Sequence, residues 1–333
     1  MNSNYFKNVV MVNVHKLFFN WLTKINNIPS FKSLSTYSKN LSPEWVTGLI
    51  DAEGCFHLGV IKRARSPLGW EINPAFKLAL DKRDSHILVL LKSFLGVGTI
   101  TQSGSIVQFQ IRSVKDLVNS LIPHLDKYPL QTQKQADYLL FKSGIELLNL
   151  KANKTVEGLQ KFVNIRAAMN FGLTSRLKEV FPNTVAVERP EVISSNVVNP
   201  DWLAGFIEGE GCFYIQITKI SNQKYQVKLT FSISQHSRDL ALFKNILKYL
   251  NCGRIDSSST RLDEIAIVVN KLDDILDKLL PFFDSYPLQG SKSLDFKDWW
   301  TVAHLMKDGL HLTDDGLESI RSIKEGMNTK RVR

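Results

Sequence analysis

Hydrophobic and polar residues alternate strictly in two stretches of the chain. Between residues 226 and 234 every odd position is hydrophobic and every even position is polar. Between residues 71 and 78 the even positions are Ile, Pro, Phe and Leu, while the odd positions are Glu, Asn, Ala and Lys. A period of two is typical of a strand with one buried and one exposed face. We therefore predict an antiparallel strand in each stretch.

Each strand belongs to a longer series of expected elements. In the first series a helical pattern follows at residues 85–94 and a second hairpin at 97–112. In the second series the helical pattern is at 237–250 and the second hairpin at 253–270, and further helical segments come after each hairpin. A helix of about three turns precedes each series and begins at an N-cap residue, Ser42 or Asn199, with proline next and then an acid. It ends at Gly54 or Gly211, where we expect a C-cap glycine. The predicted fold class is α+β, with antiparallel sheets that are exposed on one face.

The two series are copies of one unit. Residues 42–56 (SPEWVTGLIDAEGCF) match residues 199–213 (NPDWLAGFIEGEGCF) at an offset of 157. A second match, Tyr-Pro-Leu-Gln followed by a lysine at Lys134 or Lys292, has an offset of 158. Units of about 150 residues are ordinary domains. We expect a first domain at 41–180, a linker at 181–198 and a second domain at 199–333.

Composition and charge narrow the class of protein. The 333 residues are 44% hydrophobic and 22% charged, which is typical of a globular protein, and no run of about 18 uncharged apolar residues indicates a membrane span. Three scattered cysteines are too few for a disulfide framework or a zinc cluster. The net charge of +10 suggests a polyanionic partner, but residues 1–40 supply half of it with five lysines and no acid. The clearer signal is that the first hairpin of each unit is basic.

Residues 1–40 differ from the rest of the chain. They are acid-poor and Ser-rich like a mitochondrial transit peptide, but they contain no arginine. A helix on a membrane surface is a second interpretation, and its amphipathic pattern is poor. We favour a basic, poorly ordered N-terminal extension, with the other two interpretations left open.

The first helix of each unit has small residues four positions apart, Gly48 with Ala52 and Gly205 with Gly209. Such spacing allows two helix backbones to approach closely, in water as in membranes. A glycine inside a helix costs up to about 1 kcal/mol relative to alanine, so a compensating contact is expected. We predict that the two helices pack on each other along a pseudo-twofold axis.

Acids occupy the last turn of both helices. Glu53 and Glu210 stand just before the terminating glycines, where the helix dipole and the free carbonyls disfavour a carboxylate. If the helices pack side by side, the two carboxylates face each other, and a divalent cation would relieve the repulsion. Asp51 and Glu208 lie in the same turn, about 200° around the helix. Spacing alone does not choose between the two pairs.

Residues 46–54 (VTGLIDAEG) and 203–211 (LAGFIEGEG) resemble the two namesake motifs of LAGLIDADG homing endonucleases. The likeness is to the single-chain, two-motif kind encoded in group I introns of fungal mitochondria. The Tyr-Pro-Leu-Gln matches and Leu312-Thr313 also resemble that group, and the likeness covers residues 41–330. It implies two pseudo-symmetric αββαββα-type domains packed through their motif helices, with saddle-shaped antiparallel sheets that bind the DNA major groove.

The resemblance also implies an activity and its residues. The acids at the eighth motif position, Glu53 and Glu210, would bind metal, and the carbonyls of Ala52 and Gly209 would be further ligands. Mg²⁺ is the expected ion, with Mn²⁺ or Ca²⁺ as substitutes for binding. Lys134 and Lys292 are the candidates to assist at the scissile phosphates. The expected reaction is hydrolysis of both strands of a long, asymmetric target, leaving short 3′ overhangs and promoting intron mobility.

Base contacts are expected from the exposed strand faces, since side chains there can reach base edges in the groove. The candidates in the first unit are His57, Ile61, Arg63, Arg65, Trp70, Glu71, Asn73, Lys77, Thr101, Ser103, Gln108, Gln110 and Arg112. Those in the second unit are Tyr214, Gln216, Thr218, Gln226, Lys228, Thr230, Ser232 and Arg254. Lys62, Lys219 and Lys224 are expected to meet phosphates instead.

The partners implied are therefore double-stranded DNA and no membrane, with the protein functional as a monomer in the mitochondrion. Two other functions stay open. An RNA-splicing maturase would bind intron RNA, with or without cleavage. A non-catalytic DNA-binding regulator is the third, and acids in both motifs argue against it.

Overall fold

The computed structural model describes residues 41–221, 224–257, 260–328 and 331. The expected N-terminal extension, residues 1–40, lies outside them. In the first unit the order is α3 (Pro43–Glu53), β1 (Gly54–Lys62), β2 (Trp70–Asp81), α4 (Ser85–Leu95), β3 (Thr99–Ser103), β4 (Ile106–Ile111), α5 (Val114–Asp116), a π segment (Leu117–Leu121), α6 (Ile122–Lys127), α7 (Lys134–Asn149), α8 (Val156–Ala168) and α9 (Ser175–Val180).

The second unit repeats this order. It comprises α10 (Pro200–Glu210), β5 (Gly211–Ser221), β6 (Lys224–His236), α11 (Leu240–Leu250), β7 (Arg254–Ser257), β8 (Glu264–Val269), α12 (Leu272–Asp274), a π segment (Ile275–Leu279), α13 (Leu280–Ser285), α14 (Lys292–Lys307) and α15 (Asp314–Glu325). Even the π segment recurs at the matching place. The predicted α+β class and the two-unit architecture are confirmed.

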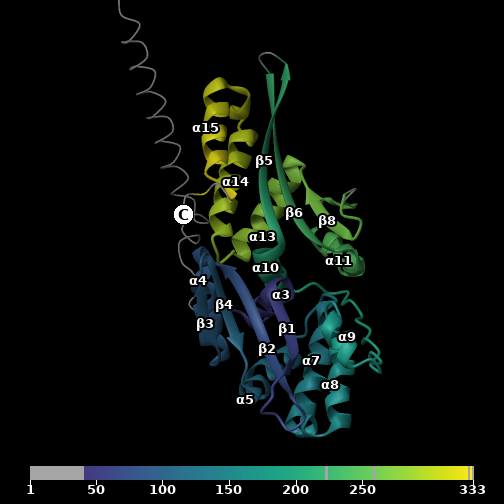
Figure 1. Ribbon diagram of the computed structural model, residues 1–333. Coiled ribbons are helices and arrows are strands. Elements are labelled where there is room, and N and C mark those ends of the chain that lie inside the picture. The colour runs from purple at the N-terminus through teal and green to yellow at the C-terminus, as the bar shows by residue number, and fades with distance from the viewer. Residues whose placement is uncertain (1–40, 222–223, 258–259, 329–330, 332–333) are drawn as a thin grey trace, which may run out of the picture.

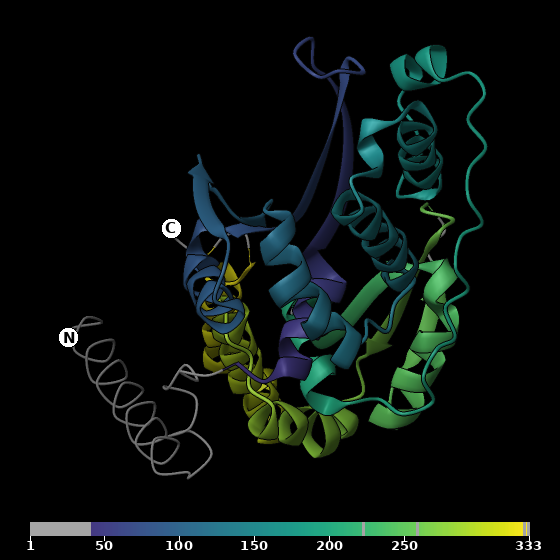
Figure 2. The same ribbon diagram turned by 90° about the horizontal axis from the view of Figure 1, so that it is seen from below.

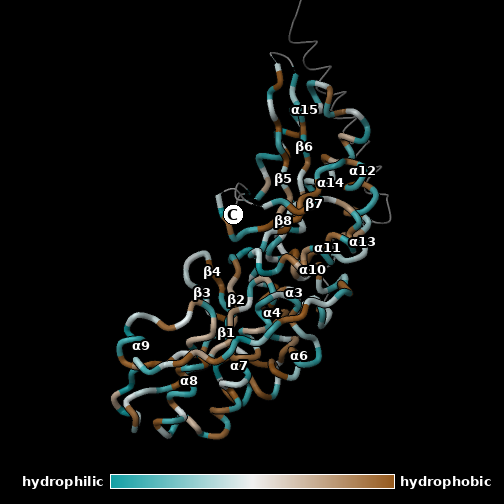
Figure 3. Tube along the Cα trace, turned by 90° about the vertical axis from the view of Figure 1, so that its right-hand side faces the viewer, coloured by the Kyte–Doolittle hydropathy of each residue, from teal (hydrophilic) through white to brown (hydrophobic). Residues whose placement is uncertain are grey.

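Each unit contains one antiparallel four-stranded sheet. The strand orders are β1-β2-β4-β3 and β5-β6-β8-β7, so the long first hairpin lies at one side of each sheet. The registers correspond, since Gly54 pairs with Leu78 in one sheet and Gly211 with Ile233 in the other. Hydrophobic and hydrophilic positions alternate along β5 and β6 in the hydropathy-coloured trace (Figure 3). The inner faces pack on helices and form the core, which leaves the outer faces open.

The ends of the motif helices follow from local chemistry. The side chain of Ser42 accepts from Trp45 N–H at the start of α3, and Asn199 accepts from Trp202 N–H at the start of α10. Gly54 and Gly211 are the C-cap residues, as expected, but with φ of −69° and −77° neither is in the left-handed conformation common for a glycine cap. Both glycines are extended because a strand begins directly at each of them. Each motif helix therefore leads straight into the first strand of its sheet.

Helices α3 and α10 form the junction between the units (Figures 1 and 3). A Cβ added to Gly48 would lie 2.0 Å from the carbonyl oxygen of Trp202, and one added to Gly205 would lie 2.0 Å from that of Trp45. The two backbones therefore meet at positions where a side chain has no room. This contact explains why a glycine, a poor helix former, stands inside each helix.

The units also exchange contacts at the starts of α7 and α14. Asp239 of the second unit accepts from Gln133 N–H at 2.7 Å, just before α7. Asp84 of the first unit accepts from the backbone N–H and the hydroxyl of Ser291, just before α14. Each unit thus satisfies free N–H groups at a helix start in the other unit, which fixes the two relative to each other.

Residues 181–199 connect the units along the outside of the molecule and contain no helix or strand (Figure 2). Arg189 in this segment donates to both carboxylate oxygens of Asp137 in α7, at 2.9 and 2.8 Å. The connection is therefore attached to the first unit. None of the helices in the described ranges is long and apolar enough to cross a bilayer.

Candidate active site at the ends of the paired helices

Glu53 and Glu210 are the last residues of α3 and α10, and the helix packing brings them together. A Cβ built on Gly209 would lie 3.0 Å from Glu53 Oε1, so the end of one helix touches the acid of the other. Burial raises the pKa of both carboxyls. For Glu210 the pKa reaches about 7, because the negative charge of Glu53 adds to the effect of burial. The two acids form a partly buried pair, and nearby lysines offset the effect of burial only in part, since the pKa of both carboxyls stays raised.

Two lysines face this pair from symmetric positions. The Nζ of Lys134 donates to the carbonyls of Ile50 and Ala52 at 3.2 and 3.0 Å. Lys292 Nζ donates to the carbonyls of Ile207 and Gly209 at 3.0 and 2.8 Å. Burial lowers the pKa of both lysines, and nearby acids oppose that shift. The lysines complete the hydrogen bonds of the two helix ends and place positive charge beside the carboxylates.

The alternative acids, Asp51 and Glu208, are committed to other contacts. Asp51 is fully buried and accepts from the backbone N–H of Gln131 and Thr132, from the Thr132 hydroxyl, and from the Trp202 indole at 2.8 Å. Glu208 accepts from Gln289 N–H at 2.6 Å. Both carboxylates hold the Tyr-Pro-Leu-Gln segments rather than face solvent. These contacts distinguish the two pairs that spacing left open: Asp51 and Glu208 bind backbone N–H groups, while Glu53 and Glu210 are the last residues of the two paired helices.

The acid pair suits a hard divalent cation that also binds a substrate. Within the described residues, no group of three or more His, Cys, Asp or Glu side chains could hold a metal by itself. Mg²⁺ is often bound by one or two protein carboxylates together with substrate phosphates, which fits two acids at an open helix end. The carbonyls of Ala52 and Gly209, expected as further ligands, accept from the lysines in this structure.

The outer sheet faces extend away from this centre on both sides. Strand pairing places most of the expected DNA-contacting residues on them, for example Lys77 beside Gln110 and Gln216 beside Lys228. Burial together with the positive charges of Lys77, Arg166 and Arg112 lowers the pKa of His57. Three positive charges therefore act on one position of the first sheet, an arrangement that favours a polyanion.

The prediction that Trp70 lies on the exposed face of the first sheet is wrong. It pairs with Lys62 at the far end of the hairpin and lies on the inner face with Ile72, where its ring meets that of Phe181 edge-on at 5.2 Å. It supports the hairpin from behind and does not belong to the exposed face.

Some candidate arginines have partners within the sheet. Arg63 pairs with Glu71 and Arg254 pairs with Asp256, with all four side chains exposed. Exposed ion pairs of this kind are weak, so a phosphate or a base edge can compete for the guanidinium group. Lys62, Lys219 and Lys224 are exposed at the far ends of the long hairpins, where a DNA backbone rather than base edges would pass.

The sequence reasoning missed two cations that reach the outer faces from helices. Arg166 of α8 interacts electrostatically with His57 and Cys55 near the start of β1. Lys324 of α15 lies 5.8 Å from the ring centre of Tyr214, at the matching place in the second unit. The offset of 158 residues between them equals that of the paired lysines, and this match is the signal that the sequence offers for them.

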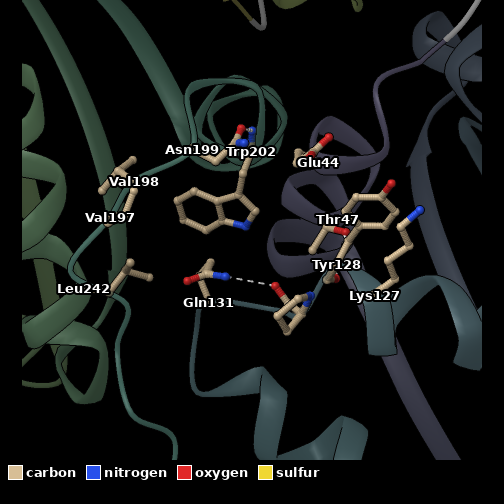
Figure 4. Close-up of a pocket in the computed structure, with 11 residues that line it drawn as sticks. Glu44, Thr47, Lys127, Tyr128, Gln131, Val197, Val198, Asn199, Trp202 and Leu242 are labelled. Carbon is tan, nitrogen blue, oxygen red and sulfur yellow. Dashed lines mark hydrogen bonds between the residues drawn. The ribbon is translucent and has the colours of Figure 1, made fainter.

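A cavity of about 210 Å³ lies at the opposite end of the motif helices (Figure 4). It is lined by Glu44 and Thr47 from the first turns of α3, by Trp202, and by the segment around Tyr128. An 11-residue helix is about 16 Å long, so this cavity is separate from the acids at the last turn. It belongs to the base of the interface between the units.

Comparison with known proteins agrees with this geometry. The family model described as LAGLIDADG endonuclease matches residues 46–145 and 203–303, one copy in each unit. The chain belongs to the LAGLIDADG endonuclease family. Each match begins in a motif helix and continues past the lysine that faces the acids, so it covers both halves of the candidate site.

Individual relatives of this LAGLIDADG protein add detail. Probable intron-encoded endonuclease 3 of Neurospora crassa is 40% identical over 296 residues, covering 87% of this chain and 55% of the relative. This chain thus spans about half the length of that relative. The homing endonuclease I-SmaMI bound to cleaved DNA has a TM-score of 0.85 and 40% identity, covering 88% of this chain and 99% of the other. I-SmaMI bound to uncleaved DNA with calcium ions gives 0.84 and 40%, covering 87% and 99%.

Proposed function

We propose that this protein is a site-specific homing endonuclease that hydrolyses one phosphodiester bond in each strand of a long DNA target. The observation that supports this most directly is the Glu53–Glu210 pair at the junction of two sheets whose outer faces are basic. A duplex lying along both sheets would place its two backbones beside the two acids. One chain supplies both halves, so the active form is a monomer.

The residues of the site have distinct duties in this reaction. Glu53 and Glu210 hold divalent metal, with Mg²⁺ as the proposed ion. When bound, Mg²⁺ lowers the pKa of water and neutralises charge that develops on phosphate oxygens. Lys134 and Lys292 neutralise part of the phosphate charge, since each ammonium group lies beside the acid pair. Arg166 and Lys324 bind backbone phosphates next to the cleavage site.

Several finer features belong to the same proposal. The cuts in the two strands are staggered and leave short 3′ overhangs, which allows insertion of an intron by repair. The protein acts in the mitochondrion, and similarity to intron-encoded proteins of Neurospora crassa supports that origin. The calcium ions in a complex of I-SmaMI with uncleaved DNA support a divalent cation at the site.

The test uses the intron-free host sequence spanning the insertion site, carried on a supercoiled plasmid. With Mg²⁺ the wild type should linearise the plasmid, and EDTA should prevent it. Glu53→Gln and Glu210→Gln should each abolish the double-strand break while target affinity in a gel-shift assay is retained. Glu44→Gln, an acid at the other end of α3, is the matched control and should cleave normally.

Linearisation by either motif variant at the wild-type rate would contradict the assignment of these acids. A wild type that binds the target but never cleaves it would support the non-catalytic alternative. An RNA-splicing role is tested separately, by adding the protein to its host intron transcript and following exon ligation.

A further inference from the structure

The two acids of the pair do not have the same neighbours. The sheets correspond residue by residue, since Gly54 pairs with Leu78 where Gly211 pairs with Ile233. Two residues further along the second strand, Leu80 in β2 therefore matches Gln235 in β6. Both pair with a buried residue of the next strand, Val107 or Ile265. One position next to the acid pair is thus apolar in the first unit and polar in the second.

This difference reaches the acids directly. The side-chain amide of Gln235 donates from Nε2 to Glu210 Oε1 at 3.3 Å. Leu80 packs against the hydrophobic core and has no polar side-chain atom to offer Glu53. Lys134 and Lys292, by contrast, make matching contacts in the two halves. The inequality therefore concerns the acids and not the lysines.

Space beside Glu210 gives the amide a further use. A groove of about 520 Å³ opens there, lined by Glu210, Gln235 and polar neighbours that include Ser234 and His236. The Gln235 carbonyl accepts from His236 N–H, and the amide nitrogen has two N–H donors, so one can bind the carboxylate while the other contacts a water molecule. The groove is large enough for ordered water. A leucine at this place could do neither.

We propose that Gln235 is a positioning residue that makes the two cleavage centres unequal, so that the strand served by Glu210 is cut before the strand served by Glu53. This inference rests on the proposed nuclease function. Partners that hold a metal-binding carboxylate typically contribute 10- to 100-fold to metal affinity or activity. A nicked intermediate, cut in one defined strand, should therefore accumulate during the reaction.

The experiment follows both strands of a target duplex, each labelled at its end with a different dye, in single-turnover reactions with Mg²⁺. Gln235→Met keeps the side-chain length and removes the hydrogen bond. It should slow the faster strand about tenfold or more and leave the slower strand unchanged. Leu80→Met introduces the same residue at the matching position and should alter neither rate. Gln235→Leu provides a second variant if Gln235→Met folds poorly.

A second measurement does not depend on cleavage. Titration of the protein–DNA complex with Ca²⁺ by calorimetry should show two unequal sites in the wild type, with the tighter site weakened about tenfold or more in Gln235→Met. Equal slowing of both strands, no slowing of either, or unchanged Ca²⁺ affinities would overturn the inference. Failure of the wild type to cut any strand would instead contradict the proposed function itself.

Discussion

Replacing Gly48 with alanine should damage the catalytic centre from a distance. The new Cβ would lie 2.0 Å from the carbonyl oxygen of Trp202 and 2.7 Å from the nitrogen of Phe206. Ordinary contact needs about 3.5 Å, so α3 and α10 must separate by roughly 1.5 Å or twist apart. The obstacles are backbone atoms of a buried helix, which cannot rotate away as a side chain can.

The magnitude follows from two opposing effects. Alanine improves helix propensity by up to about 1 kcal/mol, while overpacking of a rigid contact costs about 1–3 kcal/mol. We expect a net loss of about 1–2 kcal/mol in the free energy of unfolding. The catalytic effect should be larger, because Glu53 is five residues along the same helix and a displacement of about 1 Å can reduce a rate about 100-fold.

The assay measures urea denaturation and single-turnover plasmid cleavage for the same preparations. Gly144→Ala is the matched control, since it also introduces alanine into a helix, but its Cβ would meet methyl carbons of Leu58, the nearest at 2.8 Å. Those methyl groups can shift, so cleavage should stay at the wild-type rate. Wild-type cleavage by Gly48→Ala, or an equal loss in Gly144→Ala, would refute the argument that the backbone contact sets the position of the acids.

Three further predictions concern the acid pair, the contact between the units and the basic residues beside the sheets. Because the pKa of Glu210 is raised in the folded protein, its contribution to the free energy of unfolding in EDTA is present below its ordinary pKa of 4.5 and is lost as the pH rises through about 7. Urea denaturation across this pH range should show the free energy of unfolding falling, and Glu210→Gln should make the fall smaller. Asp239→Ala removes the acceptor for Gln133 N–H and should cost about 1–2 kcal/mol in the free energy of unfolding and slow cleavage, whereas Asp239→Asn should retain most of both. Arg166→Gln and Lys324→Gln should each reduce the slope of log affinity against log salt by about 0.9, while Arg321→Gln, whose side chain lies over Tyr225, should leave it unchanged.

Much of the fold could be predicted because the sequence contains the same pattern of elements twice. The strand period, the N-cap residues and the two matched motifs all repeat at nearly one offset, so each unit supported the interpretation of the other. Trp70 shows where this failed. Its even position puts it on the inner face with Ile72, which conflicts with its inclusion among the residues expected on the exposed strand faces. Its actual partner, Phe181, comes from the linker, and no local pattern predicts that contact.

The contacts of the acids could not be predicted from spacing either. Asp51 and Glu53 differ by two residues and point to opposite sides of one helix turn, so their environments depend on what packs against each side. Likewise, the bond from Gln235 to Glu210 joins a strand to a helix end 25 residues away. An inward-facing glutamine beside the hydrophobic Ile233 was the only local sign, and it did not identify a partner.

The repeated Tyr-Pro-Leu-Gln segments acquire a role once these contacts are known. Asp51 and Glu208 bind the backbone N–H groups of Gln131 and Gln289, each three residues before the first residue of α7 or α14. Lys134 and Lys292 are the first residues of those helices, so the buried acid of each motif fixes the start of the helix that brings a lysine to the exposed acid. The two acids of one helix turn are therefore linked through the lysine.

We expect Asp51→Asn, which weakens this anchor without changing the acid pair, to slow cleavage through displacement of Lys134. A double-mutant cycle of Asp51→Asn with Lys134→Met should show strong non-additivity in the cleavage rate. Additive effects would mean that Asp51 stabilises the fold without positioning the lysine.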